Sequence, residues 1–249
     1  MKSMIGFCLL RVVGALRSHS FETILLSLAA LHSASAQAQT PEREVFAPAS
    51  GRGSIVIAVT GQSGPVLYRD YSAKLAEQGY HVVLVSGNDI SIPGKTGPGI
   101  ANLRRVMLDA QSAASAIAGK VALVGFSVGG IGVLGHGAPL KEQVSAIVLY
   151  YPAISFVSSQ LKQFASAMQA PTLVFAGAKD QFSNCCLIET MRALEQEPKS
   201  VAFQLVVYPD AGHGFNLDAP SLGAYRKQDA DDAWARTLAF LREHHPARP

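Results

Sequence analysis

The chain lacks the patterns that define several large classes of protein. Its adjacent basic pairs, Arg104-Arg105 and Arg226-Lys227, lie far apart and outside any basic stripe, so we expect no nucleic-acid binding. Segment 60–65 contains two glycines but lacks the Gly-Lys-Ser/Thr ending of a phosphate-binding loop, which disfavours a nucleotide. No repeat, low-complexity tract or linker interrupts residues 50–245. A chain of 249 residues without such breaks is expected to form a single α/β domain.

No uninterrupted apolar run near the N-terminus reaches the ~20 residues that a membrane-spanning helix requires. The first 38 residues instead have the three parts of a secretory signal peptide. Basic residues occur up to Arg17, an apolar core covers 24–31, and small residues fill 34–38. A membrane anchor is the alternative, which the short apolar core disfavours.

We expect cleavage of this signal peptide after Ala38, with a cut after Ala36 as the alternative. Residues 1–38 are then removed, and residues 39–249 form the mature domain, with no stable membrane span. Neither an arginine pair nor a lipobox cysteine precedes the apolar core. The pattern therefore predicts Sec-type export, to the periplasm or the medium.

Cysteine is scarce, and removal of the signal peptide would leave only Cys185 and Cys186. Two cysteines in an oxidising compartment are expected to pair, although adjacent cysteines can bridge only through a small ring outside the usual geometry. The alternative is two small buried residues at a helix start, or one buried and one exposed residue. No second cysteine or histidine pair is spaced to complete a zinc site. We therefore expect neither a metal nor another cofactor.

Apolar, β-branched runs alternate with helical stretches through residues 50–245. Strands are predicted at 54–59, 81–85, 121–126, 144–151, 172–176 and 201–208, and helices at 66–78, 98–118, directly after Ser127, 156–168, 186–196 and 230–244. Near-continuous apolar strands separated by helices indicate a mostly parallel sheet covered on both faces. Ligands of such sheets bind at the carboxyl ends of the strands.

The segment Gly125-Phe126-Ser127-Val128-Gly129-Gly130 contains the G-x-S-x-G pattern directly after a predicted strand. This pattern is typical of a sharp strand-to-helix turn that exposes a serine hydroxyl. A serine hydroxyl is a poor nucleophile until a base accepts its proton, and a carboxylate usually orients that base. The pattern also suits an ordinary turn, so its interpretation depends on the partners of Ser127.

A carboxylate and a histidine follow two later strands. Asp180 comes after the strand at 172–176, and His213 lies between two glycines after the strand at 201–208. The order Ser127, Asp180, His213 matches that of the α/β-hydrolase triad. Each residue alone also suits a structural role, as a turn residue, a helix cap or a loop histidine. Asp210 is the rival carboxylate, which we expect to shape the turn before His213 instead.

Four segments together resemble the dienelactone hydrolase family of the α/β-hydrolase superfamily. They are Y-R-D-Y-S-A-K-L-A-E-Q-G-Y at 68–80, G-F-S-V-G-G at 125–130, A-G-A-K-D at 176–180 and Y-P-D-A-G-H-G-F at 208–215. The likeness spans nearly all of residues 50–245 and implies the α/β-hydrolase fold. It also implies that Ser127 is the nucleophile, His213 the general base and then general acid, and Asp180 the orienting carboxylate.

The oxyanion formed during ester hydrolysis needs fixed backbone N–H donors. We expect one from Val128, where the helix begins. The second should come from the loop after the first strand, from Gln62 or, as the alternative, Gly61. These donors would complete the site.

The chain departs from the dienelactone hydrolases proper, which carry a cysteine at the position of Ser127 and use arginines to hold a substrate carboxylate. No arginine follows His213 in segment 214–218. We therefore expect a broader serine hydrolase that cleaves small esters or lactones through an acyl-enzyme. The alternatives are an acyltransferase or peptidase with the same triad, or a catalytically silent binding protein.

Overall fold

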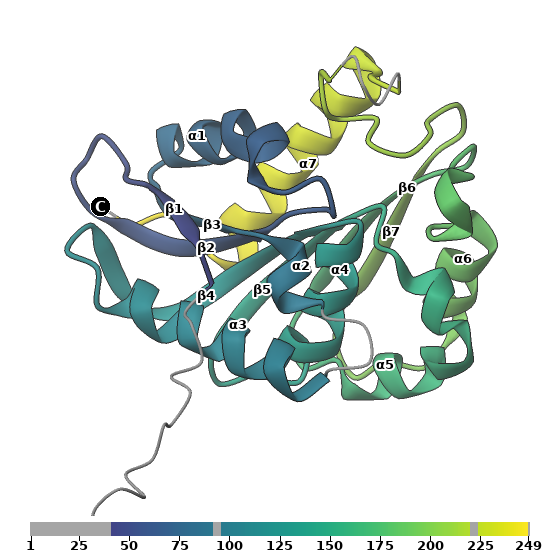
Figure 1. Ribbon diagram of the computed structural model, residues 1–249, viewed down its shortest axis with the longest axis horizontal. Coiled ribbons are helices and arrows are strands. Elements are labelled where there is room, and N and C mark those ends of the chain that lie inside the picture. The colour runs from purple at the N-terminus through teal and green to yellow at the C-terminus, as the bar shows by residue number, and fades with distance from the viewer. Residues whose placement is uncertain (1–40, 92–95, 220–223, 249) are drawn as a thin grey trace, which may run out of the picture. The chain divides into compact units, whose positions relative to one another are not determined.

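The computed structural model describes residues 41–91, 96–219 and 224–248 (Figure 1). The predicted signal peptide, residues 1–38, and its cleavage site lie outside the described residues. No helix in the described part of the chain is long and apolar enough to cross a membrane.

Within the described residues, seven strands form one sheet in the order β1-β3-β2-β4-β5-β6-β7. The strands are β1 (Arg43–Phe46), β2 (Gly53–Val59), β3 (Tyr80–Val85), β4 (Ala116–Phe126), β5 (Val144–Tyr150), β6 (Thr172–Gly177) and β7 (Phe203–Tyr208). All neighbours pair in parallel except β1, which pairs antiparallel with β3 at the edge. The predicted α/β fold with a mostly parallel sheet is thus confirmed.

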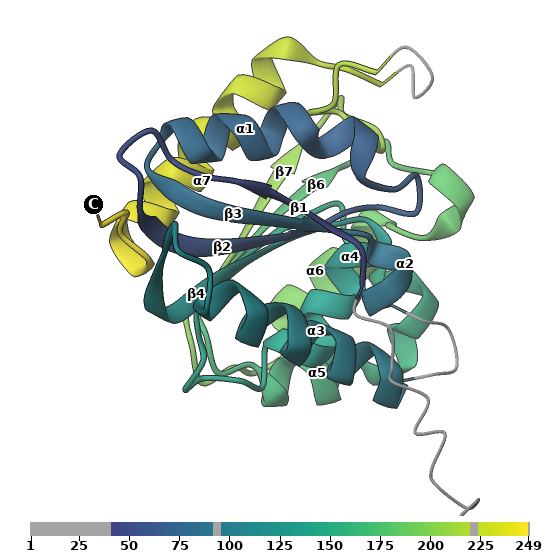
Figure 2. The same cartoon turned by 60° about the vertical axis from the view of Figure 1, so that its left-hand side comes forward.

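Helices cover both faces of this sheet (Figure 2), with α1 and α7 on one side and α3, α5 and α6 on the other. The α-helices are α1 (Arg69–Glu77), α2 (Gly87–Ile90), α3 (Thr96–Gln111), α4 (Val128–Gly132), α5 (Leu161–Ala167), α6 (Ile188–Gln196) and α7 (Lys227–His244). Shorter helical turns are η1 (Pro65–Tyr68), η2 (Val133–Gly137), η3 (Ile154–Gln160) and η4 (Phe182–Asn184). Most of the predicted elements are found within a few residues of their expected bounds.

The helix predicted at 98–118 was wrong at its C-terminal end. Helix α3 ends at Gln111, and strand β4 begins at Ala116. Residues 116 and 117 pair with Gly53 and Ser54 of β2, so sheet pairing overrides a local sequence that also suits a helix. The short edge strand β1 was not predicted, because it alternates between exposed and half-buried residues and lacks a continuous apolar run.

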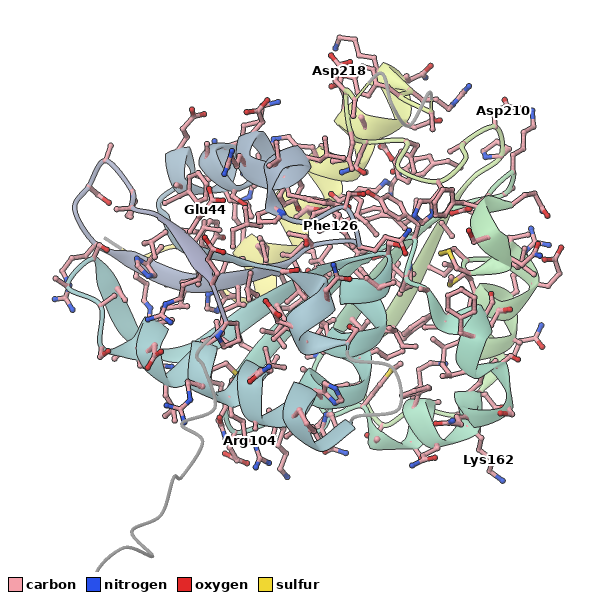
Figure 3. All side chains as sticks on the ribbon, in the orientation of Figure 1. Glu44, Arg104, Phe126, Lys162, Asp210 and Asp218 are labelled. Atoms are coloured by element: carbon pink, nitrogen blue, oxygen red, sulfur yellow. A yellow bond between two sulfur atoms is a disulfide. The ribbon has the colours of Figure 1, made fainter. Side chains whose placement is uncertain are left out.

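The core lies on both sides of the central strands. Every residue of β2 and β3 is buried, as are the last six residues of β4. Figure 3 shows Phe126, at the end of β4, inside the molecule, whereas the charged side chains of Arg104 and Lys162 lie outside. This buried sheet fixes the position of the loops that follow β4, β6 and β7, because parallel neighbours end at the same edge.

Candidate active site

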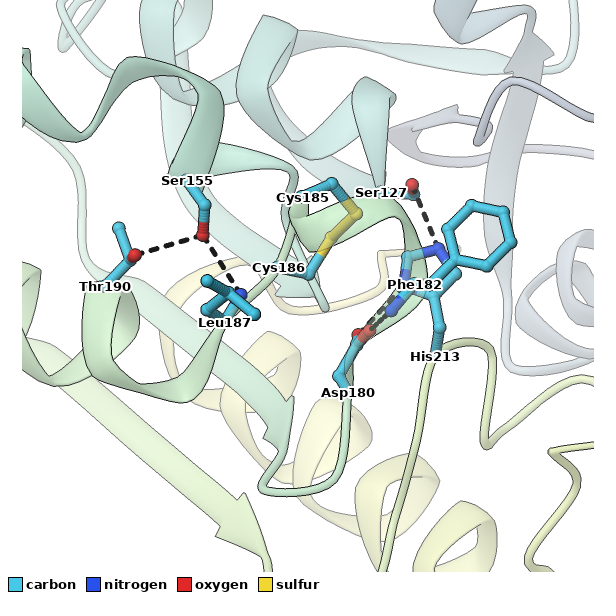
Figure 4. Close-up of a disulfide and its surroundings, with 9 residues drawn as sticks. All are labelled: Ser127, Ser155, Asp180, Phe182, Cys185, Cys186, Leu187, Thr190 and His213. Carbon is cyan, nitrogen blue, oxygen red and sulfur yellow. Dashed lines mark hydrogen bonds and ion pairs between the residues drawn. A yellow bond between two sulfur atoms is a disulfide. The ribbon is translucent and has the colours of Figure 1, made fainter.

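Ser127, Asp180 and His213 come together at the carboxyl edge of the sheet, each from the loop that follows its strand (Figure 4). The Ser127 hydroxyl lies 3.1 Å from Nε2 of His213. On the other side of the ring, Nδ1 lies 2.8 Å from Oδ2 of Asp180. Because Asp180 is a carboxylate acceptor, Nδ1 carries the proton and Nε2 is free to accept one from the serine. This arrangement suits proton removal from Ser127.

Asp180 is held rigidly in this arrangement. The residue is 1% exposed, and its second oxygen, Oδ1, accepts a hydrogen bond of 3.1 Å from the backbone N–H of Phe182. Both carboxylate oxygens therefore have a donor, which satisfies a buried charge. The carboxylate can then keep the orientation of the His213 ring fixed.

The turn at Ser127 places this side chain in an unusual backbone conformation. Its φ is 51° and its ψ is −117°, a region that non-glycine residues occupy only where the surroundings enforce it. Here the Ser127 N–H donates to the Tyr150 carbonyl over 3.0 Å, and the Ser127 carbonyl accepts from Gly130 and Ala153. The strand β5 on one side and the start of α4 on the other thus hold the turn.

The glycine after this turn has a specific steric role. A Cβ atom at Gly129 would lie 2.3 Å from the Val59 carbonyl oxygen and 2.4 Å from that of Thr60. Helix α4 can therefore approach the end of β2 only if this position has no side chain. The close approach brings the predicted donor Val128, the first residue of α4, near the loop that follows β2.

That loop contains the two predicted donors, Gln62 and Gly61. The Gly61 carbonyl accepts from the Gly64 N–H and the Thr60 hydroxyl. Since a trans peptide points its C=O and N–H in opposite directions, the N–H of Gln62 points away from these bonds. Among the described residues, neither this N–H nor that of Val128 has a hydrogen-bond partner. Both are available to a negatively charged oxygen.

A small cavity opens beside the Ser127 hydroxyl, with a volume of about 20 Å³, enough for roughly one or two water molecules. Gln62, Tyr68 and Phe182 line it, whereas Ile154, which also lies shortly after a strand end, is fully buried in the core. The remaining lining residues are Gly61, Ser63, Ser127, Tyr151, His213, Gly214 and Leu217.

Two aromatic side chains contact the His213 ring. Phe182 stacks on it with a centroid distance of 4.6 Å and an interplanar angle of 11°, and Tyr151 packs at 4.6 Å and 58°. Tyr151 was missed in the sequence, where it is the last residue of the strand predicted at 144–151. In the structure it directly follows β5, and this position at a strand end was the available signal. Burial raises the pKa of Tyr68 to about 12 and that of Tyr151 well above its usual range. Both phenols are therefore neutral donors near neutral pH.

Cys185 and Cys186 are joined by a disulfide with an S–S distance of 2.28 Å. The sequence left open whether these two cysteines are bridged, and in the structure they are. The residues lie in the turn before α6, where the Cys185 carbonyl accepts from the Ser155 N–H. The Ser155 hydroxyl accepts in turn from the Leu187 N–H and contacts Thr190 (Figure 4). This turn forms one wall beside His213.

The rival carboxylate Asp210 lies away from the His213 ring nitrogens. It pairs with Lys179 over 2.6 Å at the surface, and this hydrogen bond lowers the pKa of the Asp210 carboxyl. The Asp210 carboxylate thus forms ionic contacts, whereas we expected it to accept a hydrogen bond from the backbone of the turn. His81 is also structural: it is buried and its Nδ1 lies 3.0 Å from the Ser115 hydroxyl.

The chain is similar in sequence to several known proteins. A family model described as "Dienelactone hydrolase family" matches residues 99–245. A protein of Yersinia pestis named "Putative carboxymethylenebutenolidase" is 32% identical over 130 residues, which cover 50% of this chain and 47% of that protein. The chain thus matches about half the length of this relative. A Bradyrhizobium protein named "Probable 2-oxo-3-(5-oxofuran-2-ylidene)propanoate lactonase" is 28% identical over 218 residues, 78% of this chain and 86% of its own.

Among solved structures, a "Putative Dienelactone Hydrolase" from Klebsiella pneumoniae subsp. pneumoniae superimposes with a TM-score of 0.65. The match covers 81% of this chain and 98% of that chain, at 22% sequence identity. At this identity the likeness shows a shared fold, the one expected from the sequence.

Proposed function

The chain belongs to the dienelactone hydrolase family, and from this premise we propose that it is a serine hydrolase that cleaves carboxylic esters or lactones of small molecules. The observation that carries the proposal is the continuous contact from the Ser127 hydroxyl through the His213 ring to the Asp180 carboxylate. The names of the two curated relatives, a butenolidase and a lactonase, support an ester-type bond as the target.

The proposed reaction passes through an acyl-enzyme. Ser127 Oγ attacks the carbonyl carbon while Nε2 of His213 takes its proton, and Asp180 stabilises the imidazolium that forms. The N–H groups of Gln62 and Val128 donate to the oxyanion. When the tetrahedral intermediate collapses, the ester C–O bond breaks and His213 gives the proton to the leaving oxygen. A water molecule then attacks the acyl-enzyme by the same route and releases the acid.

The pocket favours small, uncharged acyl groups. Its volume is about 20 Å³, and its described lining includes the aromatic rings of Tyr68, Tyr151 and Phe182 but no arginine or lysine. A substrate carboxylate would therefore have no cationic partner in this lining, and its desolvation would be uncompensated. Short-chain esters and simple lactones fit better than an anionic dienelactone.

A fluorophosphonate probe tests the proposal directly. We expect it to label the wild type and not Ser127→Ala, and we expect only the wild type to hydrolyse p-nitrophenyl acetate. Ser63→Ala is the matched control, because Ser63 lines the same pocket but has no place in the mechanism, so this variant should label and hydrolyse normally. A wild type that neither labels nor hydrolyses short esters would support the silent binding protein instead.

Product analysis separates hydrolysis from the alternatives that share the triad. With alcohol or amine acceptors present, a hydrolase should release mainly the free acid, whereas an acyltransferase would pass most of the acyl group to the acceptor. Cleavage of peptide amides at rates comparable to esters would indicate a peptidase.

We also propose export by the Sec pathway, supported by the three-part pattern in residues 1–38. N-terminal sequencing of the protein from the periplasm or medium should then give a start near Gln39. An intact Met1 on a membrane-bound product would contradict this proposal.

A further inference from the structure

The Cys185–Cys186 pair lies directly against a residue of the proposed triad. The two sulfur atoms and a ring nitrogen of His213 all lie within 4.8 Å of one another, and Figure 4 shows the disulfide beside the imidazole. The cysteines are 3% and 1% exposed, and the His213 side chain is 12% exposed. Three strong metal-ligating groups therefore meet in a place shielded from water.

These groups form a suitable donor set once the sulfur atoms are free. Two thiolates and one imidazole, with a fourth position open, make up a known type of zinc site, and sulfur ligands favour thiophilic cations. With metal–ligand distances of about 2.0–2.3 Å, ligand atoms in a tetrahedral site lie roughly 3.5 Å apart. A ring nitrogen of His213 lies within 4.8 Å of both sulfur atoms. A movement of at most about 1.3 Å therefore brings it to this separation, once the sulfur atoms part after their bond is broken.

We propose that, when the disulfide is reduced, Cys185, Cys186 and His213 bind a thiophilic divalent cation such as Zn²⁺ or Cd²⁺, and that this cation inhibits the enzyme. The intact disulfide keeps the site closed. The inhibitory part rests on the proposed function, because it requires His213 to act as the base.

The chemical steps balance with a dithiol as reductant. The dithiol transfers two electrons and two protons to the S–S bond, which becomes two thiols, while the dithiol closes to a cyclic disulfide. Cation binding then forms two metal–sulfur bonds and one metal–nitrogen bond and releases the two thiol protons to solvent. Oxidation of the thiols by a disulfide of the glutathione type reverses the change and expels the cation.

Coordination of either ring nitrogen would disable His213. Nε2 faces the Ser127 hydroxyl at 3.1 Å, and Nδ1 faces Asp180 at 2.8 Å. A cation on Nε2 occupies the lone pair that would accept the serine proton, with Asp180 still bonded to Nδ1 as an outer partner. A cation on Nδ1 displaces both the Asp180 contact and the Nδ1 proton, which moves to Nε2. In both cases Ser127 loses its base.

Cadmium binding tests the site independently of activity. The protein for this experiment is the full chain with the substitution Cys8→Ser, so that Cys185 and Cys186 are its only cysteines. A thiol reagent counts the free thiols before and after dithiol treatment. We expect one Cd²⁺ per reduced chain, detected by the thiolate-to-cadmium ultraviolet band, and none per oxidised chain. The Cys185→Ser/Cys186→Ser variant should lose the band. His213→Gln should weaken binding more than about tenfold, because even outer partners of a metal ligand contribute 10–100-fold.

Hydrolysis of p-nitrophenyl acetate is followed in the same samples. We expect Cd²⁺ to abolish hydrolysis by the reduced chain to the same extent as the ultraviolet band appears, and a chelator to restore hydrolysis. Hydrolysis by the oxidised chain should be unaffected by Cd²⁺. Ser127→Ala should bind Cd²⁺ like the wild type. If no metal-free sample hydrolyses any ester, the proposed function fails, whereas cadmium binding through His213 still supports the site.

Three results would overturn the proposal. The first is a reduced, folded chain that binds no Cd²⁺. The second is binding that His213→Gln leaves unchanged. The third is a disulfide that opens only when the circular dichroism of the native fold is lost.

Discussion

Replacing Gly129 with alanine tests whether the turn after Ser127 positions the two N–H groups that we propose as oxyanion donors. The new Cβ would lie 2.3 Å from the Val59 carbonyl oxygen and 2.4 Å from that of Thr60, whereas ordinary contacts begin at 3.4 Å. Both obstructing atoms belong to the backbone, so no side chain can rotate out of the way. Helix α4 and the end of β2 must therefore move apart by about 1 Å.

This displacement separates the two donors, because Val128 begins α4 and Gln62 lies in the loop after β2. A misplacement of about 1 Å can lower a rate about 100-fold, and loss of one oxyanion donor lowers kcat about 100- to 1,000-fold. We expect kcat to fall about 100-fold, or about 2.7 kcal/mol in barrier height. Overpacking costs about 1–3 kcal/mol in the free energy of unfolding, partly offset by about 1 kcal/mol from the helix propensity of alanine.

Steady-state hydrolysis of p-nitrophenyl acetate measures kcat and KM, and urea unfolding measures stability. Gly135→Ala is the matched control: Gly135 lies in the next helical turn, η2, where a Cβ would meet only Phe164 at 3.5 Å. This control should keep the wild-type kcat. A folded Gly129→Ala variant with wild-type kcat would refute the reasoning, as would an equal loss in Gly135→Ala.

Three further predictions concern the carboxylate, acid stability and the pocket wall. Asp180→Asn should lower kcat by about 10³- to 10⁴-fold, whereas Asp210→Asn, which removes only exposed ion pairs with Lys179 and Arg226, should stay within about twofold; equal effects would contradict the assignment. Burial lowers the pKa of His245 from 6.5 to about 4, so below pH ~6.5 the unfolded chain binds a proton that the folded chain does not. Urea titrations should therefore show that the free energy of unfolding falls by roughly 2–3 kcal/mol between pH 6.5 and 4 because of His245. In His245→Gln the fall over the same pH range should be smaller by about this amount. Phe182→Ala removes the ring stacked on His213 and should raise kcat/KM for p-nitrophenyl butyrate relative to acetate roughly tenfold; an unchanged ratio would show that Phe182 does not limit the acyl group.

The predicted strands are found because their apolar runs are long and bounded by clear turns. Prediction failed where local sequence suits more than one structure, as at residues 116 and 117, which we predicted as helix and which pair with β2 as strand. It also failed at β1, whose four residues carry no distinctive pattern. Such segments take their structure from partners that are distant along the chain.

The sequence alone placed Ser127, Asp180 and His213 after three different strands in the order of a hydrolase triad. A parallel sheet brings the carboxyl ends of its strands to one edge, so residue positions along the chain were enough to predict that these three side chains lie near one another. Their distances of 3.1 and 2.8 Å, however, depend on the turn conformations that strand register and packing impose.

Only the tertiary structure decided what surrounds His213. The rings of Tyr151 and Phe182 contact its imidazole, and the sulfur atoms of Cys185 and Cys186 lie beside it, although no spacing in the sequence links these residues to a histidine in another loop. Contacts of this kind depend on how separate loops pack on the same sheet edge, to within a few ångströms. That packing is set by the whole core, so local sequence predicts that Ser127, Asp180 and His213 meet but not which side chains surround His213.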